Sequence, residues 1–173
     1  VTGLDYFAAD IMGFNVSTDI ESYEANLVVK TVIEDFSWIV GVRYIDLTDT
    51  CSIRSTDFDS GTSDYRVAAQ NHLYGGQAGI LVRHYWGRWG FEGLGKAFLA
   101  ANEAEQSNRA LDANNTFVLR DATGSNRRTA FVGEVGFNGV YILLPRVKMI
   151  VGYNMLWLAN VATGSGQLDF SST

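Results

Sequence analysis

Large apolar side chains alternate with small or polar side chains along several segments of this chain, with the period of two that is typical of β-strands. Between residues 146 and 160, one set of alternating positions carries only large apolar groups: Val147, Met149, Val151, Tyr153, Met155 and Trp157. The positions between them include Lys148, Gly152 and Asn154. The segment 130–143 repeats the pattern, because one of its faces carries Phe131, Val135, Phe137 and Tyr141.

The polarity of these two faces separates two kinds of β-barrel. A soluble barrel that holds a ligand has its apolar row inside, whereas a barrel in lipid has a continuous apolar exterior and a polar or glycine-rich lumen. A face that mixes Gly, Asn, Glu and Lys with some aliphatic residues, opposite a nearly unbroken apolar face, fits the second kind. We therefore predict an all-β fold, an antiparallel up-and-down transmembrane β-barrel. A soluble barrel or sandwich stays open as the alternative.

Seven strands are expected, at 4–14, 24–32, 37–47, 71–85, 89–101, 129–142 and 146–159. Tight turns are expected at 34–36, 86–88 and 144–145, where Gly and Pro favour hairpins. Long polar segments at 48–70 and 102–128, and a shorter one at 15–23, are interpreted as loops. Short turns at one rim and long loops at the other are typical of outer-membrane barrels.

The chain of 173 residues is expected to form a single β-barrel domain over 1–173. Antiparallel bacterial barrels close with an even number of strands, and an open edge in lipid leaves backbone groups unpaired. Seven strands therefore predict an incomplete barrel. We expect a fragment of a larger barrel, although completion by another copy of the chain is the alternative.

Composition and charge narrow the choice of function. The formal net charge of −6 argues against a nucleic-acid partner, which needs a basic surface. The single cysteine, Cys51, excludes an intrachain disulfide. No run reaches the ~18 apolar residues of a transmembrane helix, which does not argue against a barrel, because its strands need only about 9–11 residues.

The predicted lumen face carries polar groups of both signs. The candidate pore-lining residues are Asn26, Lys30, Arg43, Gln77, Arg83, Glu92, Lys96, Glu134, Asn138 and Asn154. Buried charges need partners or water, so we expect a ladder of Arg43, Glu92, Lys96 and Glu134 across neighbouring strands. Such a ladder either sets the ion selectivity of an open pore or closes a narrow barrel as a polar plug, and the sequence leaves both open.

Aromatic residues near the strand ends form the second candidate surface. Tyr and Trp side chains gather at membrane interfaces, where one edge of the ring stays hydrated. The expected interface aromatics are Trp38, Trp86, Trp89, Tyr141 and Trp157.

Catalysis and metal binding have little support in the sequence. His72 follows a serine-rich segment, and Asp57, Asp59 and Asp64 are close in sequence. These residues match neither a catalytic triad arrangement nor the spacing of an EF-hand. We expect no enzyme activity, no catalytic residues, no metal and no cofactor.

Several motifs, in their order and spacing, resemble the planctomycete-type putative β-barrel porin family. They are WIVGVRYIDL at 38–47, YGGQAG at 74–79, GRW at 87–89, GK at 95–96, VGEVG at 132–136 and GYNMLWLANVA at 152–162. The resemblance covers about 23–169. It implies a barrel in the outer membrane of a Gram-negative bacterium, with further strands upstream and a closing aromatic strand downstream. It supplies no catalytic residues.

The first functional hypothesis is a porin-like passive channel with a polar lumen, located in the bacterial outer membrane or cell envelope. Its expected partners are outer-membrane lipid and, as an option, further copies of the chain. The second hypothesis is a structural barrel subunit of an envelope lattice or surface appendage. A soluble lipocalin-like binding barrel comes third, and it would need the face of Phe131, Val135 and Phe137 to point inward.

Overall fold

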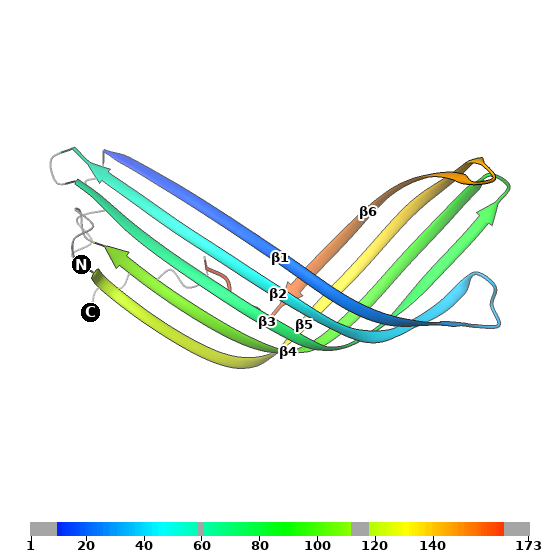
Figure 1. Ribbon diagram of the computed structural model, residues 1–173, viewed down its shortest axis with the longest axis horizontal. Coiled ribbons are helices and arrows are strands. Elements are labelled where there is room, and N and C mark those ends of the chain that lie inside the picture. Colours follow the sequence, from blue (N-terminus) through cyan, green and yellow to red (C-terminus); the bar gives the residue numbers. More distant parts are fainter. Residues whose placement is uncertain (1–9, 59–60, 112–117, 165–173) are drawn as a thin grey trace.

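The computed structural model describes residues 10–58, 61–111 and 118–164, and in these ranges the regular structure is entirely β. Six strands form one antiparallel sheet in sequence order (Figure 1). They are β1 (Ile11–Lys30), β2 (Phe36–Asp57), β3 (Gly61–Trp86), β4 (Trp89–Leu111), β5 (Val118–Leu144) and β6 (Val147–Ala159). The predicted all-β, up-and-down antiparallel fold is confirmed, and the sheet is not closed. Within the described residues, no helix is long and apolar enough to span a membrane.

The predicted loops at 48–70 and 102–128 are wrong for most of their length. β2 and β3 pair without interruption from Phe36↔Val82 to Asp57↔Gly61, and β4 and β5 pair along nearly all of the second segment. The polar residues that suggested loops, such as Thr48, Thr50 and Ser52, alternate with buried Leu47, Asp49, Cys51 and Ile53. These segments are therefore strands with one hydrated face.

The first two predicted strands are also corrected. Residues 11–30 form the single strand β1, which pairs with β2 through the segment 15–23 that was expected to be a connection. The start of the first predicted strand, at 4–9, lies outside the described residues. The described part of the chain therefore contains six strands where seven were expected.

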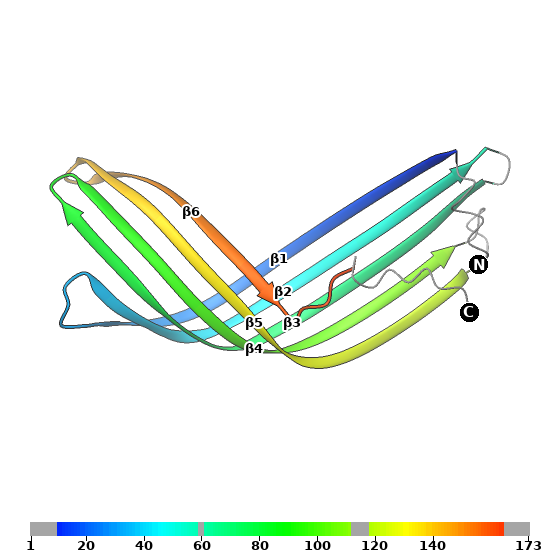
Figure 2. The same ribbon diagram turned by 180° about the vertical axis from the view of Figure 1, so that it is seen from behind.

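The strands bend together near the middle of their length, so the sheet has two arms (Figures 1 and 2). We call the arm that ends at the turns 31–35, 87–88 and 145–146 the turn half; on β3 it comprises residues 74–86. The other arm is the distal half; on β3 it comprises residues 61–73.

Alternation along each strand defines two faces. Along each strand, buried residues such as Ile45, Leu73 and Phe98 lie on the inner face. The residues between them, such as Trp38 and Leu99, are exposed on the outer face. Two apolar clusters lie on the inner face. The first contains Ile45, Leu73, Phe98, Ala100, Ala130 and Val132, and the second contains Ile53, Tyr65, Val67 and Ala110.

Glycines allow the sheet to curl toward its inner face. A Cβ atom at Gly41 would collide with the carbonyl oxygen of Ala25 and with Oδ1 of Asn26, and one at Gly75 would collide with the carbonyl oxygen of Leu99. Neighbouring backbone thus occupies the space where a side chain would be, which is a recognised use of glycine at a curved position in a sheet. The curl brings β1 toward the inner face of β4 and β5.

Candidate functional site: an ion-pair cluster on the inner face

The pairing register places all ten predicted pore-lining residues on the inner face. They are Asn26 and Lys30 on β1, Arg43 on β2, Gln77 and Arg83 on β3, Glu92 and Lys96 on β4, Glu134 and Asn138 on β5, and Asn154 on β6. A shared face follows directly from the period of two, which is why the sequence pattern could predict it. Their role as pore-lining residues stays a prediction.

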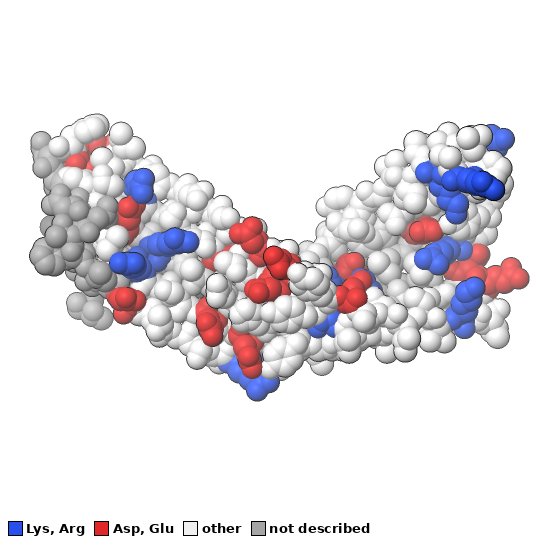
Figure 3. Space-filling model, in the orientation of Figure 1, with Lys and Arg blue, Asp and Glu red and all other residues white. Residues whose placement is uncertain are grey.

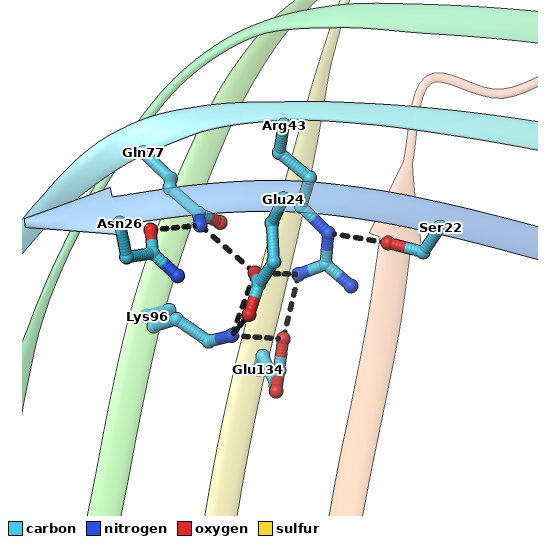
Figure 4. Close-up of polar contacts among 7 residues, drawn as sticks. All are labelled: Ser22, Glu24, Asn26, Arg43, Gln77, Lys96 and Glu134. Carbon is cyan, nitrogen blue, oxygen red and sulfur yellow. Dashed lines mark hydrogen bonds and ion pairs between the residues drawn. The ribbon is translucent and has the colours of Figure 1, made fainter.

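Four charged side chains from four strands meet in what we call the lumen cluster: Glu24, Arg43, Lys96 and Glu134 (Figure 4). Nη1 of Arg43 lies 2.6 Å from Oε2 of Glu134. Nζ of Lys96 lies 2.9 Å from both carboxylate oxygens of Glu24 and 3.1 Å from Oε2 of Glu134. Each cation therefore contacts carboxylates from more than one strand, since Arg43 also lies 3.9 Å from Glu24.

The cluster depends on the curl of the sheet. Three strand spacings separate β1 from β4, which is ~14 Å in a flat sheet. The contact of Glu24 with Lys96 bridges this separation across the inner face (Figure 4). The lumen cluster therefore crosslinks the first two strands to the fourth and fifth, in addition to the backbone ladder.

Neutral polar side chains complete the arrangement. Nε2 of Gln77, which is buried, donates to Oε2 of Glu24 at 2.8 Å and to Oδ1 of Asn26 at 2.6 Å. Nε of Arg43 donates to Oγ of Ser22 at 2.9 Å. These contacts fix the orientation of both the carboxylate and the guanidinium.

Burial is unequal within the lumen cluster. The side chains of Lys96 and Arg43 are only 6% and 8% exposed, that of Glu134 is 16% exposed, and that of Glu24 is 33% exposed. The two cations and two carboxylates balance, as buried charges require, because an unpaired charge away from water is costly. The group that the cluster presents to solvent is the carboxylate of Glu24.

The predicted charge ladder is correct for three of its four members. Arg43, Lys96 and Glu134 meet, but Glu92 lies closer to the turns, where its Oε1 is 3.6 Å from Nε of Arg83 and accepts a hydrogen bond from the hydroxyl of Tyr85 at 2.6 Å. The fourth member is Glu24, which the sequence analysis did not single out although it begins the strand expected at 24–32. Its spacing of two from Asn26 was the available signal.

All five predicted interface aromatics lie on the outer face, and four of them are more than 40% exposed: Trp38, Trp86, Trp89 and Trp157. Trp86, Trp89 and Tyr141 are cross-strand neighbours beside the turns, and the ring centroids of Trp89 and Tyr141 are 4.6 Å apart. Trp157 is placed differently, because its ring covers Gly133 on β5 in the middle of the apolar region.

A row of tyrosines marks the opposite limit of the apolar outer face, and the sequence analysis did not identify it as a row. Tyr23, Tyr44 and Tyr74 are direct cross-strand neighbours on β1, β2 and β3. The next outer row is charged or polar throughout, and it consists of Glu21, Asp46, His72, Glu103 and Arg127. The hydroxyl of Tyr74 donates to Oε1 of Glu103 at 2.8 Å, so the tyrosine row faces the polar row with its hydroxyl edge.

The two histidines are far apart on the outer face. His72 lies beside Asp46 and Tyr44 in the distal half, and Nδ1 of His84 lies 2.6 Å from Asp35 near a turn. Among the described residues, no group of three or more His, Cys, Asp or Glu side chains is arranged to hold a metal ion.

Comparison with known families agrees with this geometry. The sequence model of the family described as putative beta barrel porin-7 matches residues 6–173, nearly the whole chain. The chain belongs to this family. The resemblance to putative β-barrel porins that the motifs indicated is thereby confirmed. Neither the curated proteins nor the solved structures contain a significant match.

Membership of the putative beta barrel porin-7 family supports, in general terms, a porin-like protein of the outer membrane. It also indicates a channel role in preference to an enzymatic one.

Proposed function

We propose that this chain forms part of the wall of an outer-membrane β-barrel, and that the barrel conducts small hydrophilic ions or solutes past the lumen cluster. The observation that carries the proposal is the change in polarity along the outer face. In the turn half, residues such as Trp38, Val40 and Val42 are more than half exposed. Beyond the row of Tyr23, Tyr44 and Tyr74, the outer face is polar.

The height of the apolar region supports this location. Tyr74 and Trp86 belong to the two aromatic rows and lie 12 residues apart on β3. At ~3.4 Å per residue and a strand tilt of about 40°, this corresponds to a height of ~30 Å. An outer-membrane barrel has an apolar band of about 25 Å between two aromatic girdles, so the two values agree.

The surface view supports the same boundary. On the side in view, charged side chains lie along the distal half and near the bend, and on the turn half they gather toward the turns, with uncharged surface between the bend and the turns (Figure 3). The pairing register adds that no outer position between the two aromatic rows carries Lys, Arg, Asp or Glu, as expected for a surface in contact with lipid.

The inner face supplies the argument for conduction. At the level where the outer face is apolar, the inner face carries Arg43, Gln77, Lys96 and Glu134 beside buried apolar residues such as Phe98 and Val132. Because Glu24 is the most exposed member of the lumen cluster, we expect a modest preference for cations. The same cluster is the level that we propose for charge selection in the pore, because its side chains reach from β1 to β4 and β5.

Planar-bilayer conductance of the full-length protein tests this function. Recordings at two salt concentrations, with the reversal potential measured under a salt gradient, should give stable unitary steps and a cation-weighted potential. The variant Glu24→Gln should shift that potential toward anions. Silence from protein that is demonstrably inserted and folded would contradict a channel.

A structural barrel is the second candidate, and one observation favours it. The ion pairs between β1, β4 and β5 fill the inner face at their level, as a side-chain plug does in a narrow barrel. A soluble lipocalin-like barrel has no such support, because Phe131, Val135 and Phe137 lie on the outer face and Phe137 is 52% exposed.

A further inference from the structure

The chain leaves the sheet abruptly at the end of β6 and then crosses the inner face. Asn160 has a φ of 61°, the left-handed conformation that asparagine tolerates better than most residues. We call residues 160–164 the inner strap. In both ribbon views this segment, drawn in red, runs from the end of β6 toward the distal half (Figures 1 and 2).

Three side chains from three different strands hold the backbone of the inner strap. Asn71 on β3 uses both atoms of its amide, because Nδ2 donates to the carbonyl oxygen of Ala162 and Oδ1 accepts from its N–H, each at 2.7 Å. Oδ2 of Asp49 on β2 accepts from the N–H of Gly164 at 2.8 Å. Nδ2 of Asn102 on β4 donates to the carbonyl oxygen of Asn160 at 3.5 Å and to Oδ1 of Asn71 at 3.0 Å.

These polar side chains are buried in a wall that is otherwise apolar. Asn71 and Asn102 are 0% and 1% exposed, and Leu73 and Ala100 lie two residues from them along the same strands. A buried amide without a partner costs free energy, so the contacts with the inner strap offset a penalty that the fold would otherwise carry. Val161 packs against the first apolar cluster and adds an apolar anchor. The inner strap therefore occupies a site that is built for it.

The inner strap lies at a fixed distance from the lumen cluster. Asp49 and Asn102 lie six residues along their strands from the cluster members Arg43 and Lys96, and Asn71 lies six residues from Gln77, which donates to Glu24. Six residues of strand correspond to ~20 Å. The inner strap thus crosses the inner face on the distal side of the lumen cluster, near the level of the charged outer row.

We propose that the inner strap narrows the distal entrance of the lumen and excludes solutes by size, before the lumen cluster discriminates them by charge. The proposal rests on the proposed channel function. The specificity-determining residues are Asp49, Asn71 and Asn102, which act by positioning the strap. Loss of their contacts should widen the distal entrance without changing the charge of the lumen cluster.

Cys51 provides a direct test of strap docking that does not depend on conduction. It is the single cysteine of the chain, it is fully buried, and a Cβ atom built on Gly164 would lie 3.2 Å from its backbone nitrogen. The variant Asn71→Leu keeps the volume of the side chain but removes both hydrogen bonds to Ala162. In the full-length folded protein, maleimide should label Cys51 about tenfold faster in this variant, because local opening becomes easier when buried hydrogen bonds are lost.

The matched control is Asn15→Leu, the same change at an exposed outer position of β1. Maleimide should label Cys51 in this control variant at the wild-type rate. Equal labelling of Cys51 in folded wild-type and Asn71→Leu protein would overturn the docked strap.

The sieving role needs a second measurement. In liposome swelling with neutral sugars of increasing size, Asn71→Leu should admit sugars that the wild type excludes, while the reversal potential under a salt gradient stays unchanged. An unchanged size limit, in protein whose Cys51 has become reactive, would overturn the sieve. A wild-type protein that conducts nothing would contradict the proposed channel and the sieve together, whereas the labelling of Cys51 would still report on the docked strap.

Discussion

The turn half and the distal half are built from the same strands, but their outer faces have opposite polarity. In the turn half of β2, the outer residues Trp38, Val40 and Val42 are exposed and apolar, and the inner residue Arg43 is buried and charged. In the distal half of the same strand, the outer residues Thr48 and Thr50 are polar, and Ile53 is buried on the inner face.

We interpret this difference as a difference in the solvent that each region contacts. A strand that exposes apolar groups and buries paired charges suits lipid outside and polar contacts inside, whereas the reverse arrangement is that of an ordinary water-soluble sheet. The reversal occurs between the row of Tyr44 and the row of Asp46. We therefore interpret the tyrosine row as the membrane boundary and the distal half as a β-structure that continues into water.

The largest expected effect comes from the inner face of the distal half. Leu73 is completely buried in the first apolar cluster, so Leu73→Ala should lower the free energy of unfolding by about 2–5 kcal/mol. The control Leu99→Ala, at an outer position of the turn half with 62% exposure, should cost clearly less. Chemical denaturation in lipid vesicles measures both, and equal losses would contradict the assignment of the core.

A charge on the outer face should distinguish the two halves most clearly. Val40→Arg places a cation in the apolar band and should destabilise the protein by about 2–4 kcal/mol in vesicles. Thr50→Arg makes a comparable change on the same face of β2 in the distal half and should change stability by less than about 0.5 kcal/mol. If Val40→Arg were as harmless as Thr50→Arg, the turn half would not contact lipid.

The lumen cluster gives a smaller effect that concerns selectivity more than stability. Glu24→Gln removes the most exposed charge of the cluster and leaves Lys96 and Arg43 with Glu134. The reversal potential of the channel should move toward anions. The control Glu21→Gln, an outer residue of β1, should leave it unchanged. A shift of equal size in the control would assign selectivity to surface charge.

The smallest effect is expected on the hydrated outer face of the distal half. Nε of Arg54 lies 2.7 Å from Oδ1 of Asp64, but the side chain of Arg54 is 68% exposed. Asp64→Asn should therefore change the free energy of unfolding by only about 0–1 kcal/mol, because water screens an exposed ion pair. A loss of several kcal/mol in a denaturation series would show that this region is not fully hydrated.

The sequence predicted which face of the sheet a side chain occupies better than it predicted the lengths of the strands or the contacts between side chains. The alternation at 147–157 identified the outer face of β6 correctly, because a period of two determines side-chain direction whatever the neighbours are. The same rule applied to 48–70, but Thr48, Thr50 and Ser52 make that segment as polar as a loop, and only the pairing of β2 with β3 reveals the strand. Strand length depends on long-range pairing that a local window does not contain.

The candidate site shows the same limit. The alternation of side chains along each strand placed Arg43, Lys96 and Glu134 on one face. Which of these charges meet depends on the curl of the sheet at Gly41 and Gly75. The contact of Glu24 with Lys96 therefore could not be predicted from the sequence. The inner strap was missed for the same reason, because 160–164 has no repeating pattern and its partners lie on three distant strands.

Depth measurements along the outer face of β2 test the central claim most directly. Single cysteines at positions 38, 40, 42, 44, 46, 48 and 50, in a Cys51→Ser background, would carry a nitroxide label in vesicles containing the full-length protein. We predict that oxygen, which is enriched in lipid, relaxes the labels at 38–42 preferentially, and that a water-soluble nickel complex relaxes those at 48–50. The change from relaxation mainly by oxygen to relaxation mainly by the nickel complex should occur at positions 44–46. Uniform access of the nickel complex along the whole strand would contradict a membrane boundary at the tyrosine row.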